Sequence, residues 1–175
     1  ADLIVTSVNP DKCPESIVWC SDPANVIKDA PTVGLPGDYF YSPMQQVGEW
    51  LPYAETICSI DPSGRGADET TAAYISQRNG FLYVHEMRAY RSGYADETLL
   101  DILRGCKKYK ASSLLIESNF GDGIVAELFR KHIQTMQMNI GITETRANVR
   151  KEDRIIDSLE PVSYTHLRAH ETRHY

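Results

Sequence analysis

Thr56-Ile-Cys-Ser-Ile-Asp61 is the stretch that decides the fold, because it is a short apolar run that ends in an acid. A second stretch, Ser112-Ser-Leu-Leu-Ile-Glu117, has the same form. Short apolar runs bounded by turn signals are typical of buried strands. Both stretches are therefore predicted to be strands that end in a carboxylate.

The surrounding residues predict an α/β core over residues 56–162. Asn79-Gly80 is a strong hairpin signal, since both residues tolerate positive φ, and it separates two further predicted strands. Apolar residues at helical spacing predict helices, with Asp96 as a candidate N-cap of the first. The predicted elements are strands at 56–61, 70–77, 81–90, 112–117 and 138–142, and helices at 96–109, 123–136 and 151–159. This order predicts a mixed sheet with flanking helices, the element order of the ribonuclease H-like fold, truncated at the C-terminal end.

Composition bounds the possible functions. Hydrophobic residues make up 42% and charged residues 24% of the chain, as in ordinary globular proteins, and no apolar run is long enough to predict a membrane span. The net charge of -6 argues against a protein that coats DNA, since phosphate binding needs Lys and Arg. It does not argue against a nuclease, because carboxylates that bind divalent cations add negative charge to the sequence. No C-x-x-C pair occurs, which disfavours a zinc ribbon. Cys58 and Cys106 are predicted core residues. Cys13 and Cys20 are either free thiols or joined by a disulfide.

The two ends of the chain differ from this core. Residues 1–55 are rich in Pro and Gly, which disfavours long helices, and we interpret them as an irregular connector with a few short strands, such as 16–19. Residues 163–175 carry His166, His170 and His174 at every fourth position. These histidines either share a helix face that binds a metal or belong to a disordered or non-native tail, and we predict the tail.

Asp61 and Glu117 are the candidate catalytic residues. If the two strands are neighbours, both acids reach the same edge of the sheet. Hard cations such as Mg²⁺ prefer oxygen ligands, and two such ions can drive phosphodiester hydrolysis. The alternative is that one acid caps a loop while the other forms a salt bridge.

The loops after these strands add further candidates. Arg65 lies in a Gly-rich loop and could hold a phosphate, although no Walker A motif occurs in the chain. Asn119 could orient Glu117, and Asp122 is either a further metal ligand or the N-cap of the next helix.

Three motifs in order carry a resemblance to a family. Ser59–Thr70 reads S-I-D-P-S-G-R-G-A-D-E-T, 117–123 reads E-S-N-F-G-D-G, and 154–162 reads R-I-I-D-S-L-E-P-V. Together with residues 18–38, they closely resemble the large terminase subunit (DNA maturase) of T7-like phages, in its C-terminal nuclease domain. The resemblance implies an endonuclease that uses two Mg²⁺ or Mn²⁺ ions and cleaves concatemeric double-stranded DNA, with Asp61 and Glu117 as two of its three acids.

The resemblance also sets expectations about what this chain lacks. The third acid is expected in a later segment than this chain contains, and Asp157 is a weak substitute, so we expect this fragment to be weakly active or inactive. An ATPase domain is expected to precede the connector. The implied partners are the small terminase subunit and the portal, in the cytoplasm of a phage-infected bacterium.

Two questions stay open at this stage. The basic residues Arg146, Arg150 and Lys151, together with Arg154, either follow a DNA backbone or form a solvated helix face. The alternatives to a packaging nuclease are another ribonuclease H-like nuclease of the resolvase type and a non-catalytic docking module of the packaging motor.

Overall fold

The structure is a computed structural model that describes residues 3–4, 9–30, 39–63, 69–117 and 123–145. The chain divides into two compact units. The larger unit comprises Val8–Cys13 and Trp50–Ala147, and the smaller includes Pro14–Glu49. In the described part of the chain, no helix is both long and apolar enough to cross a membrane.

The N-terminal region is more regular than the sequence predicted. A two-stranded sheet joins β2 (Lys12–Val18) to β4 (Gln45–Pro52). A second sheet joins the short strands β1 (Leu3–Ile4) and β3 (Phe40–Tyr41), and a 3-10 turn spans Pro23–Asn25. The prediction of an irregular connector missed β4, because nearly every residue of this strand is exposed and its sequence shows no apolar alternation.

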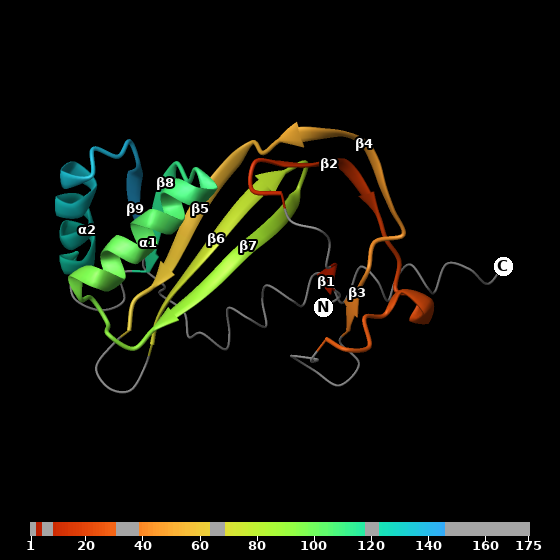
Figure 1. Cartoon of the computed structure of the whole chain (residues 1–175), viewed down its shortest axis with the longest axis horizontal. Coiled ribbons are helices and arrows are strands. Elements are labelled where there is room, and N and C mark those ends of the chain that lie inside the picture. The colour runs from red at the N-terminus through yellow and green to blue at the C-terminus, as the bar shows by residue number, and fades with distance from the viewer. Residues whose placement is uncertain (1–2, 5–8, 31–38, 64–68, 118–122, 146–175) are drawn as a thin grey trace. The chain divides into compact units, whose positions relative to one another are not determined.

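A five-stranded mixed sheet forms the larger unit, as predicted (Figure 1). Its strands are β5 (Glu55–Asp61), β6 (Thr70–Arg78), β7 (Phe81–Tyr90), β8 (Ser113–Glu117) and β9 (Gly141–Thr145), in the spatial order β7-β6-β5-β8-β9. The first three strands are antiparallel, whereas β8 is parallel to β5 and β9 is parallel to β8. Asn79 and Gly80 have φ of 51° and 80° in the β6–β7 turn, which confirms the predicted hairpin.

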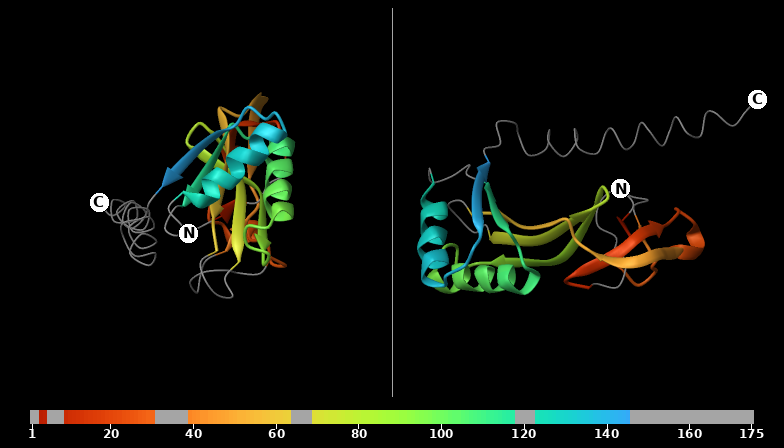
Figure 2. Two further views of the ribbon diagram at one scale, coloured as in Figure 1. Left: turned by 90° about the vertical axis from the view of Figure 1, so that its left-hand side faces the viewer. Right: turned by 90° about the horizontal axis from the view of Figure 1, so that it is seen from above.

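Two helices, α1 (Asp96–Tyr109) and α2 (Ile124–Thr135), cover one face of this sheet (Figures 1 and 2). Every second side chain of a strand points to the same face of the sheet, and those on the covered face pack against the two helices. The buried core comprises Cys58, Ile60, Ala72, Tyr74, Leu99, Ile102, Leu103, Cys106, Tyr109, Ala111, Leu114, Ile116, Val125, Ala126, Phe129 and Ile133. In the described residues, both helices pack on the same face of the sheet.

Three local predictions need correction. Ala95, not Asp96, is the N-cap of α1, and no side chain caps it. The last strand lies at Gly141–Thr145 and not at 138–142, because Gln137 has positive φ and the Met138 N–H still bonds to a carbonyl of α2. All four cysteines are free, so the disulfide alternative is wrong.

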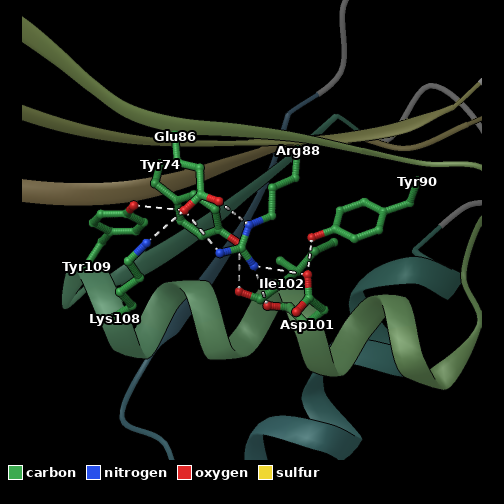
Figure 3. A network of polar contacts seen from close by, with 8 residues as sticks. All are labelled: Tyr74, Glu86, Arg88, Tyr90, Asp101, Ile102, Lys108 and Tyr109. Carbon is green, nitrogen blue, oxygen red and sulfur yellow. Dashed lines mark hydrogen bonds and ion pairs between the residues drawn. The ribbon is translucent and has the colours of Figure 1, made fainter.

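A polar network fastens the edge strand β7 to α1 (Figure 3). The Arg88 guanidinium bonds to Glu86 on its own strand, at 2.8 Å, and to Asp101 on α1, at 3.0 Å. The hydroxyl of Tyr109, the last residue of α1, also donates to Glu86. Hydrogen bonds from Arg88 and Tyr109 lower the pKa of Glu86 to about 2. A charged pair this well hydrogen-bonded holds its partners in one geometry.

A β-bulge places His85 beside this network. The β6–β7 register shifts between Tyr74 and Ile75, so that His85 has no partner residue on β6. Its Nε2 lies 2.7 Å from the Ser76 hydroxyl, while its Nδ1 is buried without a hydrogen-bond partner. Burial lowers the pKa of His85. Only one of the two ring nitrogens of His85 therefore has a hydrogen-bond partner.

Gly105→Ala is expected to destabilise the protein although it improves helix propensity. A methyl group at this position would overlap the hydroxyl and ring of the fully buried Tyr74, with Cε1 at 2.7 Å. Overpacking costs about 1–3 kcal/mol, which exceeds the gain of about 1 kcal/mol from helix propensity. Urea unfolding measures the change, with the exposed Lys107→Ala as control. A more stable Gly105→Ala variant would contradict the packing argument.

The stability of the protein is expected to fall as the pH is lowered below 6.5, in part through His85. The folded-state pKa of His85 lies below its ordinary value of 6.5, so the unfolded chain takes up the proton first. The contribution of neutral His85 is thus fully present above pH 6.5 and is lost as the pH falls through its folded pKa. Urea unfolding at a series of pH values should show that the free energy of unfolding falls less in His85→Gln than in the unsubstituted protein. An equal fall in the two proteins would refute the assignment to His85.

Candidate functional site

The two predicted acids end neighbouring parallel strands. Ile60 of β5 pairs with Ile116 of β8, and Asp61 and Glu117 are the next residues on each strand. Paired strands lie about 4.8 Å apart, and successive side chains alternate between faces. Since Ile60 and Ile116 are buried beneath the helices, Asp61 and Glu117 lie on the opposite face of the sheet, side by side at its edge.

A pocket that includes Glu117, but not Asp61, lies at the same end of these strands. It is lined by Pro62, Ile116, Glu117, Gly123, Val125, Ala126 and Glu144. Gly123 is the N-cap of α2 and has φ of 84°, a backbone conformation that favours glycine. The pocket therefore brings together the ends of β5, β8 and β9 with the N-terminus of α2.

Glu144 is an acid at this pocket that the sequence did not single out. It lies on β9, opposite Ile116, and its Oε1 is 3.7 Å from Nη2 of Arg130 on α2. The predicted strand ended at residue 142, so Glu144 fell outside every predicted element. A strand placed three residues later would have revealed a third acid near a strand end.

Hydrogen bonds fix the chain as it leaves β5 after Asp61. The Ser63 N–H donates to Oγ1 of Thr70 at 3.0 Å, and that hydroxyl donates to Oγ of Ser63 at 3.0 Å. Both residues are buried. The Tyr94 hydroxyl donates to the carbonyl of Ser63. Burial raises the pKa of Tyr94, the hydrogen bond with Ser63 lowers it by less, and the negative charge of Asp61 raises it slightly.

The other predicted site residues lie outside the described part of the chain. They are Arg65, Asn119, Asp122, Arg146, Arg150, Lys151 and Asp157. Within the described residues, no group of three or more His, Cys, Asp or Glu side chains is arranged to hold a metal ion. The structure thus brings together Asp61 and Glu117, and their role as ligands stays a prediction.

Comparison with known proteins identifies the family. Residues 60–167 match the sequence model of the family described as "Terminase Bacteriophage T7, Ribonuclease H-like domain". The chain belongs to this family. Its five-stranded mixed sheet, with α1 and α2 on one face, is the ribonuclease H-like fold of a terminase nuclease domain, which confirms the predicted fold class.

The terminase relationship extends over nearly the whole chain. The large terminase subunit of Enterobacteria phage T3 is 36% identical over 168 residues, which cover 94% of this chain and 28% of that protein. The chain therefore spans just over a quarter of the length of this curated relative.

Solved structures with a similar backbone come from two kinds of virus. The Holliday junction resolvase of fowlpox virus matches with a TM-score of 0.41 and 13% identity, over 60% of this chain and 71% of that chain. The nuclease domain of the large terminase subunit gp2 of bacterial virus Sf6 matches with a TM-score of 0.41 and 19% identity, over 59% of this chain and 44% of that chain.

Proposed function

We propose that this chain is the endonuclease domain of a viral DNA-packaging terminase, and that it cleaves concatemeric double-stranded DNA with Asp61 and Glu117 as catalytic carboxylates. The observation that carries the proposal is the parallel pairing of Ile60 with Ile116, which brings the two acids to one edge of the sheet. Membership of the terminase family supports the same activity.

The donor set at this edge fits a hard divalent cation such as Mg²⁺ or Mn²⁺. Carboxylate oxygens are the ligands that such ions prefer, and Asp61 is exposed while Glu117 is half-buried, so that solvent and substrate can reach them. Two ions bound there would supply the activation of a water molecule and the stabilisation of the leaving oxygen. The two carboxylates would hold the ions, and the buried strands beneath them would keep both side chains at a fixed spacing.

Other residues of the chain would act on the DNA backbone. Arg65 and Asn119 follow the two acids in sequence and would contact phosphates, and Asp122 and Asp157 are weaker candidates for a further ligand. The basic residues Arg146, Arg150 and Lys151 would neutralise the DNA backbone farther along. Such contacts position DNA without reading its sequence, so site selection would come from the small terminase subunit and the portal.

The place of the chain in a larger protein is also a proposal. The T3 relative is a large terminase subunit of which this chain matches 28%. We infer that residues 1–55 connect to a preceding ATPase domain and that residues 56–162 form the nuclease domain. The whole protein would work in the cytoplasm of an infected bacterium.

Asp61→Ala is expected to abolish Mn²⁺-dependent nicking of supercoiled plasmid, because the site loses one of its two carboxylates. Agarose gels follow the conversion of supercoiled plasmid to the open circular form. The reaction contains the full chain at high protein concentration, and the same reaction with EDTA is the blank. Glu55→Gln, a change at the opposite end of the same strand, is the control and should nick like the unsubstituted chain. Metal-independent DNA binding without nicking, even in a longer chain that includes the downstream segment, would indicate the docking module instead.

A further inference from the structure

A side chain from the β7–α1 turn reaches the chain just beyond Asp61. The Tyr94 hydroxyl donates to the backbone carbonyl of Ser63, and the two residues are separated by 31 positions in sequence. We propose that Tyr94 is a positioning residue for Asp61, because its hydroxyl fixes the backbone of Asp61-Pro62-Ser63 and thereby the carboxylate at the edge of the sheet. This inference rests on the proposed function of Asp61 as a metal ligand.

The turn that carries Tyr94 is itself tied to the core. The Ala95 N–H bonds to the Ser92 carbonyl at 3.2 Å, and the Ser92 hydroxyl lies 2.6 Å from that of Thr98 on α1. Thr98 is buried, and the Tyr94 ring packs against the hydrophobic core. The position of the Tyr94 hydroxyl is therefore fixed by the packing of its ring and by the hydrogen bonds of its turn.

The segment that receives this bond has little other freedom. Ser63 is held to Thr70, the first residue of β6, through its N–H and its hydroxyl. Pro62 has a restricted φ and lines the pocket beside Glu117. Tyr94 supplies the remaining bond, to the Ser63 carbonyl, so that three hydrogen bonds fix this residue two positions after Asp61.

The Tyr94 hydroxyl is the hydrogen-bond donor to this segment. A phenol ionises only at about pH 10, so this donor keeps its proton at neutral pH. Outer partners that orient a metal ligand are common in metal sites, and their loss typically weakens metal binding by about 10–100-fold.

The test compares two tyrosines of the same region. Tyr94→Phe is expected to weaken Mn²⁺ binding to the full chain by about 10-fold or more, measured from the free Mn²⁺ signal in electron paramagnetic resonance titrations. Tyr90→Phe is the matched control, because it deletes a hydroxyl that donates to Asp101 at 2.8 Å and not to the Asp61 segment. Both variants should lower the thermal unfolding temperature, but only Tyr94→Phe should change Mn²⁺ affinity. A change in affinity that is equal in the two variants, or absent from both, overturns the proposal.

A second pair keeps the proposal testable should Tyr94→Phe fail to fold. Thr70→Val removes the hydroxyl that holds Ser63, whereas Thr56→Val removes a buried hydroxyl at the opposite end of β5, 2.6 Å from that of Ser76. Weaker Mn²⁺ binding in Thr70→Val alone supports the anchoring of Asp61 through Ser63. Equal Mn²⁺ affinity in the two variants overturns it.

Asp61→Asn separates the two levels of inference. If the unsubstituted chain binds Mn²⁺ and Asp61→Asn does not, the proposed ligand role stands, and the tyrosine and threonine pairs then decide the positioning role alone. If Asp61→Asn binds Mn²⁺ as tightly as the unsubstituted chain, both the proposed ligand role and the positioning role fail.

Discussion

The parallel pairing of β5 with β8 is the constraint on which the rest of this terminase domain depends. Ile60 and Ile116 are buried beneath α1 and α2, which fixes the register of the pair. Because side chains alternate along a strand, a slip of one residue would turn Ile60 toward solvent and Asp61 into the core. The burial of two isoleucines therefore determines where two carboxylates lie. Stability and the candidate chemistry are set by the same register.

The candidate site lies at the end of a well-packed frame. Asp61 and Glu117 end neighbouring parallel strands on the face of the sheet away from the helices, whereas Glu144 is paired with Ile116 and contacts Arg130 of α2. The helix-covered face beneath them is apolar and well packed, and Ser63 and Thr70 close the β5–β6 connection with buried hydrogen bonds. The ends of β5 and β8 are thus held in a fixed register, on which the proposed role of Asp61 and Glu117 depends.

The outer half of the sheet is held by charge and not by apolar burial alone. β7 is an edge strand whose face away from the helices exposes Leu82, Val84 and Met87. On its other face, Arg88 and Glu86 join it to α1 through Asp101 and Tyr109 (Figure 3). The bulge at His85 adds one residue to the strand, so the exposed side chains fall at even positions before it (Leu82, Val84) and at odd positions after it (Met87). The same face of β7 therefore stays exposed along the whole strand.

By itself, the sequence determined the elements of the domain with strong local signals. The hairpin at Asn79-Gly80, the helix at Asp96–Tyr109 and the strands that end in Asp61 and Glu117 follow from turn chemistry and apolar spacing, which act between residues close in the chain. Only the tertiary structure decided the start of β9, the place of Glu144, the strand at Gln45–Pro52 and the contact of Tyr94 with Ser63. These features depend on strand register and on hydrogen bonds between residues far apart in sequence, which leave no periodic pattern along the chain. The two strand-ending acids were therefore predicted from the sequence, whereas Glu144 and the hydrogen bonds around Ser63 emerged only from the fold.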